Sequence, residues 1–120
     1  MNKLIFVAVM LLSVSAYSGT LTCTGTVDEL AYHANGRFML KLSSMNTAVF
    51  FCNSDVEWAV SGTGYKTSPE TCRMLYSTFL AAKAMQSSVD YIHFDGDEVP
   101  ASCDSFERWA NVHVRFFRLR

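Results

Sequence analysis

Four cysteines most limit the folds open to this chain of 120 residues: Cys23, Cys52, Cys72 and Cys103. An even number of cysteines in a small domain is typical of exported proteins, because thiols pair under oxidising conditions. A domain of this size buries limited apolar surface and gains stability from covalent links. We therefore expect two disulfides, and the sequence leaves all three possible pairings open. A link between Cys52 and Cys72 would contribute about 3 kcal/mol in the chain-entropy model.

Two other roles fit these cysteines less well. Zinc sites usually place cysteines in CxxC pairs or near two histidines, and the chain has neither arrangement. Cys72 falls in the first turn of a predicted helix, where the helix dipole favours a reactive thiolate. Oxidation would consume such a thiol outside the cell, and two disulfides leave no cysteine over. We expect no metal and no other cofactor.

The first 18 residues predict a secretion signal. Lys3 precedes an apolar run at residues 4–12, and the small residues after it suit cleavage near residues 16–19. The run is too short to span a bilayer as a helix, which disfavours a membrane anchor. We expect residues 19–120 to form a single domain that is secreted or periplasmic, with no membrane span once the signal is removed.

The charge of the chain argues against nucleic acid as a partner. Without Lys3, nine Lys and Arg residues stand against eleven Asp and Glu residues, which gives a formal charge of −2. Binding to nucleic acid depends on a clustered positive face. The one basic run is small and lies among aromatic residues: Arg115, Arg118 and Arg120. Solvated strand ends explain this run as well as a partner does.

Hydrophobic periodicity predicts a mostly β chain with one helix. Alternating or β-branched residues predict strands at residues 20–33, 37–44, 46–52, 56–60, 89–96 and 111–120. A break in the alternation near Asp28 and Glu29 indicates a bulge. The pair Asn35-Gly36 is typical of a two-residue hairpin turn.

The helix has the clearest boundaries of any predicted element. Ser68 suits the N-cap, Pro69 suits the first helical position, and Glu70 suits the positive end of the helix dipole. The helix should run from residue 69 to about residue 86. Helical spacing defines one buried stripe along it: Cys72, Leu75, Tyr76, Phe79, Ala82 and Met85 or Gln86.

The order of the main elements is three strands, the helix and two more strands, which is the order of the oligomer-binding (OB) barrel. A long first strand with a bend suits that barrel, because its first strand takes part in both halves of the sheet. We expect a mainly β domain with one α-helix: a five-stranded OB-like barrel, the helix between strands 3 and 4, and two disulfides. An antiparallel sheet with one packed helix is the alternative.

Three segments resemble small exported bacterial OB-fold proteins, the B subunits of the subtilase-cytotoxin and pertussis-like groups: "GTVDELAYHANGRFMLKLSS", "SPETCRMLYSTFLAAKAMQSSVDYIHFDGD" and "VHVRFFRL". The most specific part is the helix "MLYSTFLAAK" followed by a strand ending in "FDG". The resemblance implies glycan recognition on a rigid barrel and assembly into a ring. The sugar contacts of that family lie on the early strands and adjoining loops, which makes Ser43 and Ser44 in "KLSSMN" candidates for ligand binding.

Aromatic residues are the richest feature of the chain. Adjacent aromatics in "VFF" and "RFF" point to opposite faces of a strand, so one of each pair must face outward or toward the helix. In the last strand, alternation groups Phe116 with Val112 and Val114. It groups Phe117 with His113 and Arg115.

Three aromatic residues near polar loops are the main candidates for ligand binding: Trp58, Tyr65 and Trp109. Trp and Tyr rings suit either sugar stacking or a subunit interface. Packing is the other explanation for these rings. An aromatic ring that stays exposed needs no ligand to explain it, because exposed single apolar residues are ordinary.

The histidines, His33, His93 and His113, fall on three predicted strands. His93 shares a strand face with Tyr91, opposite Ile92 and Phe94. His93 and His113 would be neighbours if the last two strands are adjacent. A metal or acid–base role would then require suitable geometry.

The carboxylates of "DGDE", Asp95, Asp97 and Glu98, alternate as calcium ligands do but lack the longer ligand series of an EF-hand. We expect a solvated acidic turn. The chain has no GxSxG elbow and no phosphate-binding glycine loop. We therefore assign no catalytic residue and do not expect an enzyme.

These observations favour a secreted, non-catalytic binding module that recognises a glycan or receptor in the manner of a toxin B subunit, with a homo-oligomer as a possible assembly. The alternative is a periplasmic inhibitor or immunity-type protein that binds a partner protein through an aromatic edge. A small calcium-supported structural domain is a third hypothesis.

Overall fold

The computed structural model describes residues 19–120, so the expected secretion signal lies outside the described residues. Within this range the chain is mainly β with one helix, as predicted. No helix in this range is long and apolar enough to cross a membrane. The elements in chain order are β1 (Gly19–Tyr32), β2 (Arg37–Leu42), β3 (Val49–Asn53), β4 (Trp58–Ala59), β5 (Lys66–Thr67), α1 (Pro69–Met85), β6 (Ser88–Gly96) and β7 (His113–Leu119).

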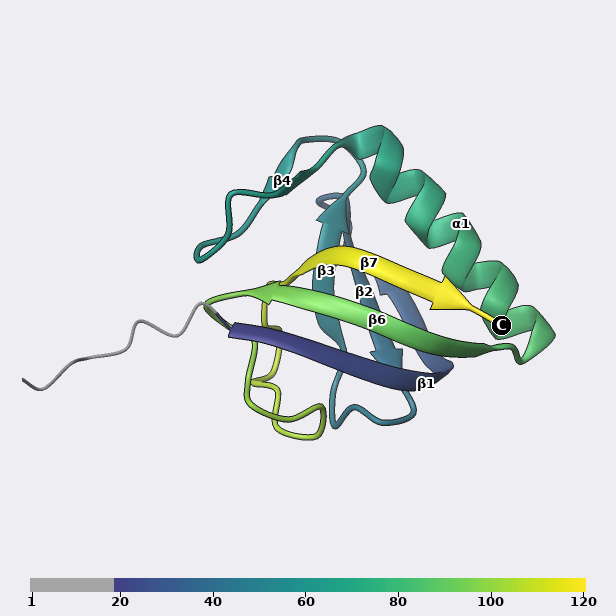
Figure 1. Cartoon of the computed structure of the whole chain (residues 1–120). Coiled ribbons are helices and arrows are strands. Elements are labelled where there is room, and N and C mark those ends of the chain that lie inside the picture. The colour runs from purple at the N-terminus through teal and green to yellow at the C-terminus, as the bar shows by residue number, and fades with distance from the viewer. Residues whose placement is uncertain (1–18) are drawn as a thin grey trace, which may run out of the picture.

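Five of these strands form one antiparallel sheet in the order β3-β2-β1-β6-β7, and β4 pairs with β5 in a separate small hairpin. The long strand β1 pairs with β2 along one half and with β6 along the other. In Figure 1, β6 and β7 consequently run across β2 and β3. The predicted bulge in β1 is confirmed, because the register shifts between Val27 and Glu29.

The turn between β1 and β2 is longer than predicted. Residues 33–36 separate the two strands, and the main-chain N of His33 donates to the carbonyl of Arg37 at 2.8 Å. The hairpin itself is confirmed, but the two-residue turn is wrong. Gly36 has a φ of 86°, a conformation that glycine adopts without strain.

The two ends of the sheet approach each other without closing it into a barrel of paired strands. Phe50 of β3 makes an isolated parallel bridge with Asn111, just before β7. Its main-chain N donates to the carbonyl of Ala110 at 2.9 Å, and its carbonyl accepts from the main-chain N of Val112 at 2.9 Å. This bridge joins the two halves of the sheet at one point.

Helix α1 lies between the third and fourth strands of the sheet in chain order, as predicted. Ser68 caps it by accepting a hydrogen bond from the main-chain N of Thr71 at 3.1 Å. The stripe formed by Cys72, Phe79 and Ala82 is buried. Met85 or Gln86 was expected to extend this stripe, but Met85 is 75% exposed and Gln86 is exposed as well, so the buried stripe ends at Ala82.

Both expected disulfides are present, and the described residues contain no free cysteine. Cys52 bonds to Cys72 and ties β3 to the first turn of α1. Cys23 bonds to Cys103 and ties β1 to the long loop between β6 and β7. The buried core fills the space that these links enclose, and its largest side chains with almost no exposed surface are Phe50, Phe51, Phe79 and Phe94.

Candidate functional site

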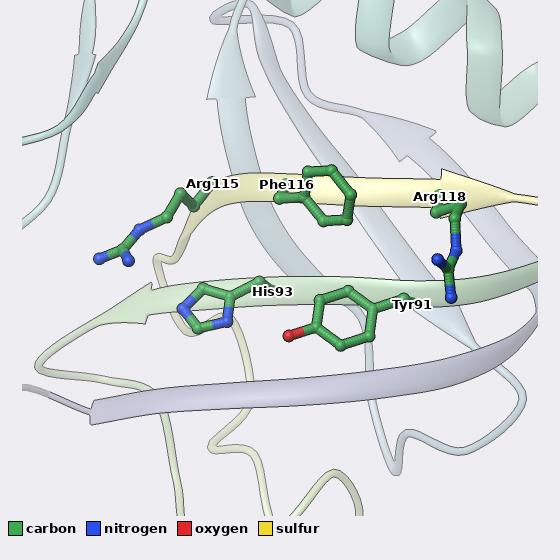
Figure 2. A pocket seen from close by; sticks show the side chains of 5 residues that line it. All are labelled: Tyr91, His93, Arg115, Phe116 and Arg118. Atoms are coloured by element: carbon green, nitrogen blue, oxygen red, sulfur yellow. The ribbon is translucent and has the colours of Figure 1, made fainter.

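A shallow hollow of about 430 Å³ lies on the outer face of the last two strands of the sheet. Figure 2 shows its five lining side chains projecting from β6 and β7 on the same side. This β6–β7 hollow is defined by Tyr91, His93, Arg115, Phe116 and Arg118. The rings of Tyr91 and Phe116 form its floor, and the side chains of His93, Arg115 and Arg118 border it.

The floor consists of Tyr91 and Phe116. Their ring centroids lie 5.7 Å apart at an interplanar angle of 68°, an edge-to-face arrangement. Phe116 is 52% exposed, so its ring faces solvent. The pair therefore offers apolar surface directly to solvent.

A bulge in β7 explains why Arg115 and Phe116 both line the hollow. His93 pairs with Phe116, whereas the next residue, Phe94, pairs with Val114, so Arg115 has no partner in the ladder. A bulge of this kind changes the alternation of side chains between the two faces. Both Arg115 and Phe116 consequently point toward the hollow.

The same bulge overturns the predicted grouping of the last strand. Phe116 was expected to share a face with Val112 and Val114, but these two residues are buried while Phe116 is exposed. Phe117 takes the inner position instead, and its ring centroid lies 4.9 Å from that of Phe79 in α1.

A buried carboxylate fixes one side of the hollow. Asp95 is only 2% exposed. One of its oxygens, Oδ2, accepts a hydrogen bond from Arg115 Nε at 2.9 Å, and the other, Oδ1, lies 3.0 Å from His93 Nε2. The expected solvated acidic turn is therefore wrong for Asp95, although Asp97 and Glu98 are exposed. The charge of Arg115 and the hydrogen bond with His93 offset the cost of burying this carboxylate.

A second carboxylate fixes the other side of the hollow. Arg118 donates from Nε at 3.1 Å and from Nη2 at 2.7 Å to Asp90 Oδ2. Arg120 also reaches this oxygen, with its Nε at 3.1 Å. Because both arginines of the hollow are held by carboxylates, their geometry is set before any ligand arrives.

His113 lies behind Asp95 and is almost fully buried. Its Nδ1 is 3.7 Å from Asp95 Oδ2 and has no hydrogen-bond partner among residues 19–120. Burial lowers the pKa of His113 below its ordinary value of 6.5, because a charged imidazole would lose its hydration. Asp95 opposes this shift in pKa, while the positive charge of Arg115 adds to it.

The lowered pKa of His113 predicts a loss of stability in acid. The unfolded chain takes up the proton more readily than the folded chain, so stability is complete above about pH 6.5 and falls as the pH drops toward the folded pKa. Urea unfolding at several pH values should show this slope, and His113→Gln should flatten it. His33→Gln is the control and should leave the slope in place. An unchanged slope in the His113 variant would contradict the prediction.

The residues expected from sequence to bind a ligand are spread over the surface and the core. Tyr65 is 52% exposed and borders the β6–β7 hollow, since the Arg115 guanidinium lies 4.5 Å from its ring centroid. The Tyr65 ring also stacks on His113 with centroids 5.7 Å apart. Trp58 is only 9% exposed and donates from Nε1 to the carbonyl of Val112 at 2.9 Å, so the indole serves core packing.

The other three candidates lie elsewhere. Trp109 is 52% exposed and meets His33 edge-to-face with centroids 5.8 Å apart. Ser43 and Ser44 are exposed in the turn after β2, and Ser43 Oγ accepts from the main-chain N of Thr26 at 3.1 Å. The structure therefore places only Tyr65 of the five beside the β6–β7 hollow.

The hollow combines open aromatic rings with fixed hydrogen-bond donors. Such a surface can hold a ligand that has both apolar faces and polar edges. The last two strands are adjacent, and both His93 and His113 lie against Asp95. Residues 19–120 contain no group of three or more His, Cys, Asp or Glu side chains arranged to hold a metal ion.

Comparison with protein families, with curated proteins and with solved structures finds no match.

Proposed function

We propose that the protein is an exported, non-catalytic binding module that recognises a glycan through the β6–β7 hollow. The observation that carries this proposal is the pair of half-buried Tyr91 and exposed Phe116, flanked by arginines held in place by Asp95 and Asp90. Sugar rings present C–H faces that stack on aromatic rings, and their hydroxyl oxygens accept hydrogen bonds from Arg and His. The predicted signal and the two disulfides support export.

We further propose that the fold is an OB-like barrel. The strand order β3-β2-β1-β6-β7, the position of α1 between β3 and β6, and the bridge from Phe50 to Asn111 all support it. The resemblance to toxin B subunits favours the same fold and a homo-oligomeric ring. Light scattering on the oxidised protein would test the ring, and a monomeric mass would contradict it.

Replacing Phe116 with alanine should weaken glycan binding about tenfold or more, because the variant loses half of the aromatic floor. The measurement is a glycan array on the oxidised protein, followed by titration with the best glycan. Trp109→Ala is the matched control, since Trp109 and Phe116 are equally exposed at 52%. An array without binding, or equal losses in the two variants, would contradict the proposal.

A second candidate function is an inhibitor or immunity-type protein that binds a partner protein. The observation favouring it is the exposed apolar surface of α1, where Met74, Leu80 and Met85 are 66%, 48% and 75% exposed. This function predicts an array without binding. It also predicts that Met74→Glu with Met85→Glu, and not Phe116→Ala, abolishes binding to an exported protein encoded by a neighbouring gene.

A further inference from the structure

A second hollow, of about 380 Å³, lies where the β1–β2 hairpin meets the chain after β3 and helix α1. It shares no residue with the β6–β7 hollow. The residues that define this hairpin hollow are Tyr32, His33, Ala34, Gly36, Phe38, Ser54, Asp55 and Tyr76.

Three aromatic rings, one each from β1, β2 and α1, form the apolar wall of the hairpin hollow. The ring centroids of Tyr32 and Phe38 lie 5.9 Å apart, and those of Phe38 and Tyr76 lie 4.5 Å apart. Tyr32 is 67% exposed, the most exposed of the large aromatic side chains in the described range. The row of rings therefore ends in an open aromatic face.

A positioned carboxylate lies on the polar side of the same hollow. The main-chain N of Asp55 donates to Asn53 Oδ1 at 2.8 Å, and Asn53 is itself 6% exposed. The Asp55 carboxylate sits close against Gly36, where an added Cβ would lie 2.6 Å from Oδ2. Asp55 makes no ion pair with any residue between 19 and 120. Oδ1 accepts a long hydrogen bond from Ser54 Oγ at 3.5 Å, and the carboxylate keeps further acceptor capacity.

The walls of the hairpin hollow are fixed to one another. The Cys52–Cys72 disulfide joins the strand before Ser54 to the helix that carries Tyr76. Arg73 Nη2 donates to the carbonyl of Ser54 at 2.8 Å, which adds a second link between the same two walls. Ligand binding would therefore require little ordering of the protein, which lowers its entropic cost.

We propose that the hairpin hollow is a second ligand site, which takes the ring of a neutral monosaccharide. The sugar ring stacks on Tyr32 and the neighbouring rings, and its hydroxyls donate to Asp55. The Asp55 carboxylate repels an anionic ligand, and the row of rings requires a ligand with an apolar face. A neutral ring with several hydroxyl donors satisfies both conditions. This proposal does not depend on the β6–β7 hollow.

The test is an NMR titration of the oxidised full chain with methyl glycosides of glucose, galactose and mannose. We expect the amide signals of Gly36, Ser54 and Asp55 to shift with at least one of them. Tyr32→Ala should weaken that binding about tenfold. Asp55→Asn, which keeps the size of the side chain, should weaken it while leaving the spectrum otherwise folded.

Asp97→Asn is the matched control for Asp55→Asn, because Asp97 is also an exposed carboxylate but lies outside the hairpin hollow, and this variant should bind the methyl glycosides as the parent protein does. Absence of shifts at Gly36, Ser54 and Asp55 with all three sugars would overturn the proposal, as would unchanged affinity in both hairpin-hollow variants. Failure of the β6–β7 proposal is a different result, because it appears as glycan-array binding that Phe116→Ala does not reduce.

Discussion

Replacing Cys23 and Cys103 together with alanine is expected to lower the free energy of unfolding by about 4.5 kcal/mol, the chain-entropy value for the loop this disulfide closes. The two cysteines are 80 positions apart, and the link anchors the long segment between β6 and β7 to β1. Without it, the middle of this segment keeps the two hydrogen bonds of Asn46, which donates to the carbonyl of Phe106 at 2.8 Å and accepts from its main-chain N at 2.8 Å.

Urea unfolding followed by circular dichroism measures this loss of stability. The matched control is the double replacement of Cys52 and Cys72, which are only 20 positions apart and should cost about 3 kcal/mol. Each double variant removes two sulfur atoms. The difference between the two losses of stability therefore reflects the length of the loop that each disulfide closes. A larger loss for the Cys52 and Cys72 replacement would contradict the prediction.

Replacing Phe79 with alanine should destabilise the protein by about 3–5 kcal/mol, the usual range for deleting a buried ring. Phe79 has no exposed surface and joins α1 to two strands. Its ring meets Phe51 of β3 edge-to-face with centroids 5.5 Å apart, and that of Phe117 of β7 at 4.9 Å. The variant leaves a cavity between the helix and both edges of the sheet, because neighbours relax only partly.

The adjacent residue supplies the control for this second prediction. Leu80→Ala removes a similar apolar group from the same turn, but Leu80 is 48% exposed and should cost less than about 1 kcal/mol. Thermal or urea unfolding of both variants gives the comparison. Similar losses in the two variants would show that Phe79 does not hold the helix to the sheet.

Features set by short stretches of sequence were predictable. The N-cap at Ser68, the proline after it and the bulge near Glu29 each depend on neighbouring residues, and the structure confirms them. The presence of two disulfides followed from the cysteine count and the size of the domain. Their pairing was not predictable, because it depends on which strands the fold brings together.

The β6–β7 hollow was only partly predictable for the same reason. Alternation correctly placed Tyr91 and His93 opposite the buried Ile92 and Phe94. It failed in β7, where the bulge at Arg115 depends on pairing with β6 and leaves no local signal. The burial of Asp95 was missed because acidic residues beside glycine usually mark turns. One of its three partners, His93, lies two residues away on the same strand, but His113 and Arg115 belong to β7 and reach Asp95 only because β7 pairs with β6.

The bulge in β7 gives this strand one residue more than its pairing with β6 requires. Removing Arg115 alone would restore simple alternation and leave the other faces unchanged, because Val114 and Phe117 stay on the inner face and Phe116 stays opposite His93. The buried Asp95 would lose the hydrogen bond from Arg115 Nε. A one-residue deletion at this point would therefore keep the helix packed on the sheet while leaving a buried carboxylate without its guanidinium donor.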